Sequence, residues 1–194
     1  MNRWKIISYS GNALTFSSLI FLILIYLHRT LLTPAQIILI SVVSVLFSTL
    51  IPLLYILFFI KEKRKIHLDY NFSERKYRIK PFIVAILSYG IGTACLFSLN
   101  APTLIKGLML CYFVNSIIIV SITLFWKISV HAAGITGPLT VLIYKFGVLY
   151  FPLYLIVVPV ALARIKLKEH TLAQVIGGAL LVAFTTWLQI LLIF

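Results

Sequence analysis

Charged residues are scarce in this chain, and acidic ones are the scarcest. Of the 194 residues only 11% are charged and only 4 are Asp or Glu, whereas 62% are hydrophobic. A soluble domain of this size cannot hide so much apolar side chain, because its surface must be largely polar. The composition therefore excludes a soluble globular domain and a disordered chain, and it indicates a multi-span integral membrane protein.

Cysteines and clustered carboxylates are also lacking. The two cysteines, Cys95 and Cys111, fall in apolar stretches, where small inert core residues are expected. The four acidic residues are scattered at positions 62, 69, 74 and 169, so no carboxylate cluster offers a magnesium site. We therefore expect no metal and no other cofactor.

The apolar residues fall into seven runs. Their lengths, and the absence of alternation with period two, favour helices over strands. The sequence predicts an all-α polytopic transmembrane helical bundle with about six to seven spans, forming a single domain over residues 1–194. The predicted spans are 11–28, 35–60, 82–99, 104–126, 131–146, 148–163 and 171–194. The fifth and sixth runs would each reach only about 24 Å, less than a hydrocarbon core of ~30 Å, so they are expected to begin below the headgroups or to thin the bilayer.

Basic residues are strongly biased to one side of this topology. If all seven runs cross, 14 of the 17 basic residues share the face that carries the N-terminus and the 61–80, 127–130 and 164–170 connections. The opposite face keeps Arg29, Lys106 and Lys145. The positive-inside rule makes the crowded face cytoplasmic, in the cytoplasmic membrane. The net charge of +13 then reflects cytoplasmic loops and membrane lipids as partners, not nucleic acid.

Three short stretches on that same face carry the reactive side chains. They are residues 73–81, 126–134 and 163–178, and the second and third lie at helix starts, where unpaired N–H groups favour an anion. Histidines can attack or protonate a phosphate, and arginines bind one through two hydrogen bonds. The candidate phosphate-site residues are His131, His170, Ser129, Arg75, Arg78, Lys80, Lys127 and Arg164.

The second and third stretches resemble motifs of the type 2 phosphatidic acid phosphatase superfamily, which includes the vanadium haloperoxidases. The family's second motif, Pro-Ser-Gly-His, is similar to 128–131, with Ser129 and His131 at matching places. Its third motif, Ser-Arg-x5-His-x3-Asp, is similar to 163–174, with Arg164 and His170 matched and Gln174 in place of Asp. Its first motif, Lys-x6-Arg-Pro, is matched at Pro81 alone. The resemblance covers about residues 70–190.

The resemblance implies a metal-independent phosphatase with a phosphohistidine intermediate. His170 would be the nucleophile and His131 the general acid and base. Gln174 would orient His170, while Arg164, Ser129, Lys127 and the cations of the first stretch would bind phosphate. A site at headgroup level implies a lipid phosphate or polyprenyl (di)phosphate as substrate.

Two alternatives come from other classes of protein. The neutral Gln174 and the divergent first motif are also compatible with a non-catalytic membrane protein that binds lipid phosphate or a partner subunit. A transporter or channel is disfavoured, because the spans carry no ionisable residue at their middle; Lys106 lies near a span end and can reach the interface.

Overall fold

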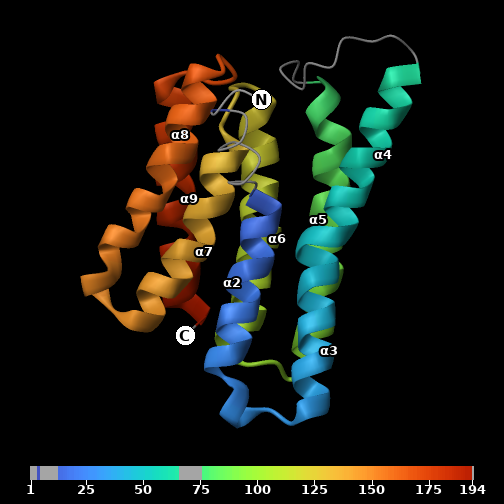
Figure 1. The fold of residues 1–194 in the computed structure, drawn as a ribbon, viewed down its shortest axis with the longest axis vertical. Helices are drawn as coiled ribbons and strands as arrows, with labels where there is room; N and C mark the ends of the chain where they lie inside the picture. The colour runs from blue at the N-terminus through green and yellow to red at the C-terminus, as the bar shows by residue number, and fades with distance from the viewer. Residues whose placement is uncertain (1–3, 5–12, 66–75, 194) are drawn as a thin grey trace.

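The protein forms an all-α bundle in a computed structural model that describes Trp4 and residues 13–65 and 76–193. Over these residues the chain makes seven passes that alternate in direction (Figure 1). The passes are α2 (Ala13–Leu27); α3 (Pro34–Val45), continued by the π-helical turn η2 (Leu46–Leu50) and α4 (Ile51–Lys65); α5 (Lys76–Ser98); α6 (Thr103–Thr123); α7 (Val130–Phe146); the 3-10 helix η3 (Val148–Ile156), continued by α8 (Val157–Lys166); and α9 (Leu172–Ile193). A short 3-10 turn, η1 (Arg29–Leu31), follows α2. The all-α prediction is confirmed.

Five of the helical segments are long and apolar enough to cross a membrane. They are Pro34–Phe59, Ile79–Ser98, Thr103–Thr123, Val148–Lys166 and Leu172–Ile193. Helix α2 is a shorter apolar helix of 15 residues, and α7 has 17 residues.

The sixth pass gains length from its 3-10 segment. A 3-10 helix rises ~2.0 Å per residue, against ~1.5 Å in an α-helix. The nine residues of η3 and the ten of α8 therefore extend over about 33 Å, against about 28.5 Å for an α-helix of the same length. The rest of the difference from the ~24 Å expected for 148–163 comes from three more residues at the end of α8. Gly147, at φ 100°, and Pro152 inside η3 favour this departure from α-helix.

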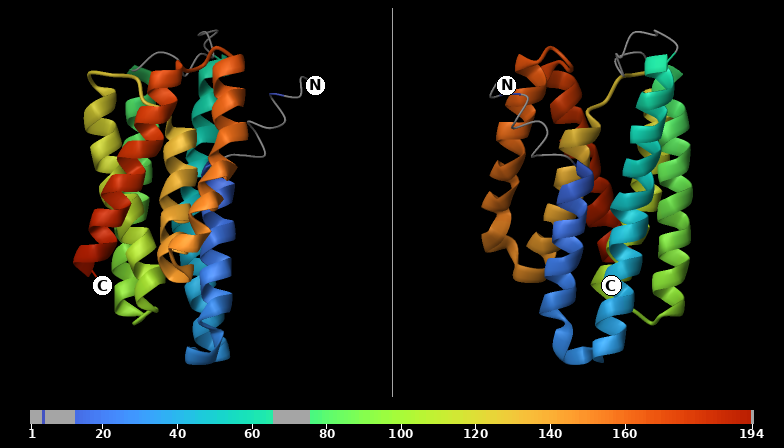
Figure 2. Two further views of the ribbon diagram at one scale, coloured as in Figure 1. Left: turned by 90° about the vertical axis from the view of Figure 1, so that its left-hand side faces the viewer. Right: turned by 45° about the vertical axis from the view of Figure 1, so that its right-hand side comes forward.

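Helix α7 lies at the centre of the half of the bundle that carries the second and third stretches. Ala132, Ile135 and Leu139 pack with Val160 of α8 and Val175 of α9. The next face of α7 packs against α6 and α9 through Ala133, Ile119 and Val182. The left view of Figure 2 shows α9 crossing beside α6 and α7. Another cluster of larger side chains joins α2, α3, α5 and α6, and it also includes Val141 and Leu142 of α7 and Ile190 of α9.

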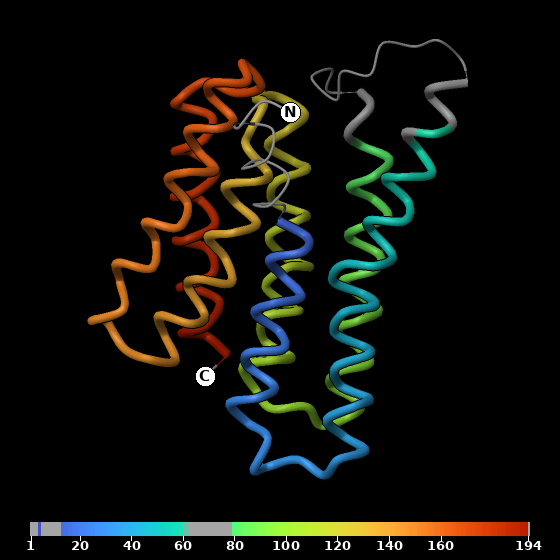
Figure 3. The backbone as a smooth tube through the Cα atoms, viewed as in Figure 1, coloured from blue at the N-terminus to red at the C-terminus, as the bar shows by residue number. Residues whose placement is uncertain are grey.

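One end of the bundle gathers the connections that carry the candidate residues of the second and third stretches. There α5, α7 and α9 begin, and α4, α6 and α8 end; this is the upper end in Figures 1 and 3. We call it the site end. The connections 124–129 and 167–171 both lie at this end.

Candidate functional site

The turn between α8 and α9 fixes the spacing of Arg164 and His170. The Glu169 N–H donates to the Arg164 carbonyl at 3.0 Å, and the Lys168 N–H donates to the Ile165 carbonyl at 2.9 Å. Lys168 has φ 56°, so these bonds form a Schellman motif with Lys168 in the left-handed position. The His170 N–H also donates to the Arg164 carbonyl, at 3.3 Å. The five residues between arginine and histidine are therefore those of one helix cap.

A capping box starts α9 and contacts the His170 ring. Thr171 Oγ1 accepts from the Gln174 N–H at 3.3 Å, and Gln174 Oε1 accepts from the Thr171 N–H at 3.2 Å. Gln174 Oε1 also lies 3.2 Å from His170 Nδ1. His170 is buried, with 7% of its surface exposed.

These bonds determine the tautomer of His170. The Thr171 N–H is a donor, so the Gln174 amide must present its oxygen there. That oxygen can only accept, and the hydrogen bond with His170 therefore requires a proton on Nδ1. The lone pair of the neutral ring then lies on Nε2, the nitrogen that a nucleophilic role requires.

The start of α7 contacts the start of α9 through the main chain of Ser129. The Ser129 N–H donates to the Gln174 carbonyl at 3.1 Å. Gly178 makes this approach possible, because a Cβ at that position would lie 2.7 Å from the Ser129 carbonyl oxygen. The second and third stretches of the sequence are thus joined directly by one hydrogen bond.

The Ser129 side chain is buried at this junction. The residue has the extended conformation of an N-cap, yet its hydroxyl makes no capping bond. The Oγ atom is fully buried and has no hydrogen-bond partner in the described part of the chain. Leaving a buried hydroxyl unsatisfied costs about 1–3 kcal/mol.

The remaining candidates of these two stretches lie close by along the chain. His131 is in the first turn of α7, and Lys127 lies in the connection before it; both are half-buried. The Arg164 side chain is 14% exposed, and its Nη2 atom lies 3.7 Å from Glu169 Oε2.

Of the first stretch the structure describes residues 76–81, at the start of α5, and the next residue, Phe82, packs against the cluster that contains Ile128 and Ala133 of the second stretch. Lys80 is exposed on α5, which Figure 1 shows on the far side of α2 and α6 from α8 and α9. Arg78 belongs to the same helix, but its side chain lies outside the described residues, as does Arg75 entirely. Phosphate binding by these three residues stays a prediction.

Two contributors were missed in the sequence. The sequence did not predict that Glu169 contacts Arg164. The feature that could have revealed it is the Schellman motif, in which the N–H of the second residue after the helix end, Glu169, donates to the carbonyl of Arg164. Thr171 was not expected to pair with Gln174. A signal existed, because Thr33-Pro-Ala-Gln36 forms the same capping box at the start of α3.

The described residues contain no group of three or more His, Cys, Asp or Glu side chains that could hold a metal ion.

Comparisons with protein-family models, curated protein sequences and solved structures gave no match to this chain.

Proposed function

We propose that the chain is a multi-pass membrane phosphatase that hydrolyses a lipid phosphate or a polyprenyl (di)phosphate. The junction between Ser129 and Gln174 is the observation that carries this proposal. It joins the two stretches that hold Ser129, His131, Arg164 and His170, at one end of the bundle.

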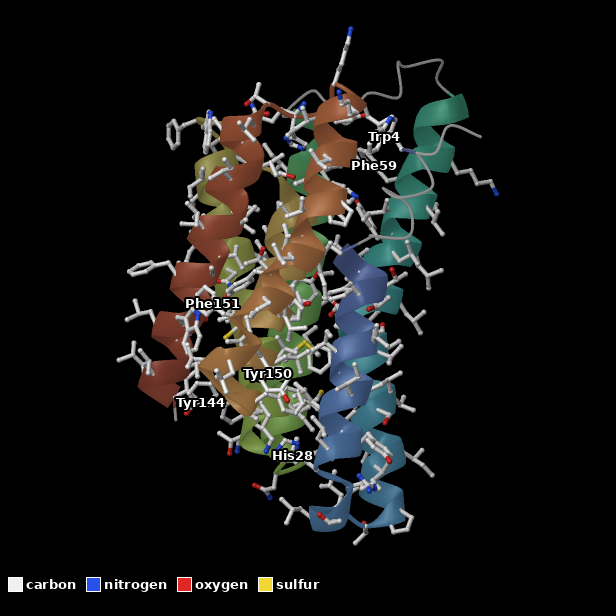
Figure 4. The ribbon with its side chains drawn as sticks, turned by 60° about the vertical axis from the view of Figure 1, so that its left-hand side comes forward. Trp4, His28, Phe59, Tyr144, Tyr150 and Phe151 are labelled. Carbon is white, nitrogen blue, oxygen red and sulfur yellow. The ribbon has the colours of Figure 1, made fainter. Side chains whose placement is uncertain are left out.

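The lateral surface supports the membrane assignment. Large apolar residues such as Leu149, Leu180 and Phe184 are 65–89% exposed, which water would penalise and lipid favours. Aromatic residues are exposed near both ends: Phe125 and Trp126 at the site end, Tyr144 and Tyr150 near the other end (Figure 4). Such belts are typical of the two membrane interfaces. Seven spans with the site end in the cytoplasm are part of the proposal.

The proposed reaction has two steps. His170 Nε2 attacks phosphorus, the bond from phosphorus to the leaving oxygen breaks, and His131 gives that oxygen its proton. His131 then takes a proton from water, the resulting hydroxide attacks the phosphohistidine, and inorganic phosphate and free His170 are formed. Arg164 and the Ser129 hydroxyl would bind the equatorial oxygens, where negative charge accumulates.

Gln174 supports the nucleophile by position, not by charge. Its amide oxygen sets the proton on Nδ1, but a neutral amide stabilises a positive imidazole less than a carboxylate does. The presence of an amide at position 174 is also explained by its role in capping α9, without any role in catalysis. This second explanation favours the alternative of a lipid-phosphate-binding protein without catalysis, and the experiment below separates the two.

The test is phosphate release from a panel of lipid phosphates by purified protein in detergent. We expect activity that a chelator does not remove. His170→Ala should abolish it, whereas His28→Ala should not, because His28 bonds its own helix through the Leu24 carbonyl at the opposite end (Figure 4). Thermal unfolding of both variants in detergent checks that they are folded.

Near-normal turnover by His170→Ala would refute the catalytic role of this histidine. Absence of release by the wild type, with phosphate binding retained, would favour the binding protein.

A further inference from the structure

Glu169 is the only carboxylate whose side chain the structure describes, and it contacts the arginine of the proposed phosphate site. Its Oε2 atom lies 3.7 Å from Arg164 Nη2. That distance is too long for a strong hydrogen bond, whereas arginine binds phosphate through two short parallel bonds.

The main chain fixes the two residues relative to each other. The Glu169 N–H donates to the Arg164 carbonyl, so the main chain keeps the two residues adjacent while the turn is intact and leaves their side chains free to rotate. The side chains nevertheless differ in freedom. Arg164 is 14% exposed, whereas Glu169 is 34% exposed and can turn toward solvent.

We propose that Glu169 is a built-in competitor for phosphate on Arg164. The carboxylate contacts the guanidinium when the site is empty and turns toward solvent when a phosphate group binds. By returning, it lowers the affinity for the inorganic phosphate product and speeds its release. This inference rests on the proposed function for the identity of the ligand, and it adds a residue that sets how strongly the site holds phosphate.

Exposed ion pairs contribute modestly, so the expected effect is moderate. Glu169→Gln removes the competing charge and keeps the shape of the side chain. We expect it to tighten binding of inorganic phosphate about three- to tenfold. Glu169→Asp retains the charge and should stay closer to the wild type. The difference between Glu169→Gln and wild type should shrink as salt rises from about 0.05 M to about 0.5 M, because added ions screen the competing charge.

The measurement is the rise in thermal unfolding midpoint of detergent-solubilised protein on titration with inorganic phosphate, and separately with a short-chain phosphatidic acid. This readout does not depend on turnover. Glu62→Gln is the matched control, since it changes the net charge equally on α4, across the bundle from α8 (Figure 1). It should leave phosphate binding unchanged.

The inference would be supported if Glu169→Gln binds both inorganic phosphate and the short-chain phosphatidic acid more tightly than the wild type does, and Glu62→Gln does not. Unchanged or weaker binding would overturn it, even if Glu169→Gln also lowered the unfolding midpoint without phosphate, because the ion pair would then be structural only. Tightening of the lipid alone would overturn it as well, since the carboxylate would not act on the phosphate group. Binding by neither wild type nor variant would refute the proposed phosphate site itself.

Discussion

Gly178→Ala tests whether the contact between α7 and α9 assembles the site. The added Cβ would lie 2.7 Å from the Ser129 carbonyl oxygen, 3.3 Å from Ile128 Cγ1 and 3.4 Å from the Ser129 nitrogen. A carbon–oxygen contact is comfortable at about 3.3 Å, so the connection must move away from α9 by about 0.6 Å. The obstacle is main chain, and no side-chain rotation can relieve it.

The expected loss of activity exceeds the expected loss of stability. Overpacking costs about 1–3 kcal/mol, and the better helix propensity of alanine returns about 1 kcal/mol. The net change in unfolding free energy is therefore about 1 kcal/mol, which leaves the protein folded. A displacement approaching 1 Å between catalytic groups lowers rates by up to about 100-fold, and we expect phosphate release to fall about 10- to 100-fold.

Gly177→Ala is the matched control. Its Cβ would come within 2.7 Å of Trp126 Cη2 and 2.8 Å of Cζ3, an equally close approach. That obstacle is the far end of a side chain that is 40% exposed, so the indole ring can turn away. We expect Gly177→Ala to keep most of its activity and its unfolding midpoint. Wild-type turnover by Gly178→Ala would show that the close approach of Ser129 to α9 is unnecessary, and it would refute this reasoning.

Two further predictions concern the turn and the cap beside His170. Lys168→Gly should raise the unfolding free energy by about 0.5–1 kcal/mol, because lysine is strained at φ 56°, and denaturant unfolding measures this change. Asn100→Gly, at φ 49°, should raise the unfolding free energy less, because asparagine tolerates that conformation. Gln174→Glu should retain the capping box and increase phosphate release, because a carboxylate stabilises positive charge on His170 better than an amide does. Gln36→Glu changes the equivalent box of α3 and should leave release unchanged, whereas an equal increase in both variants would exclude a direct effect on His170.

The helical fold was predictable because the physics behind it is local. Apolar runs of this length must satisfy their own main-chain hydrogen bonds in a membrane, and a helix does so within one segment. The departures from α-helix required knowledge of packing. The π-helical turn at Leu46–Leu50 accompanies Pro52, which lacks an N–H, and the Phe47 carbonyl there accepts from the hydroxyl of Ser88 on α5. No pattern within 46–52 reveals that distant partner.

The candidate site likewise has a part that local sequence determines and a part that depends on helix packing. The distance along the chain from Arg164 to His170 is a local property, because one Schellman motif and one capping box account for each residue between the end of α8 and the start of α9. The contact of Ser129 with Gln174 is not local, since it depends on α7 and α9 packing closely enough at Gly178 for a main-chain hydrogen bond. The two adjacent glycines of α9, Gly177 and Gly178, mark a close approach in the sequence but do not show which one meets the main chain of Ser129. The chemistry proposed for His170 therefore depends on a helix cap that the sequence encodes directly and on a helix packing that only the folded chain reveals.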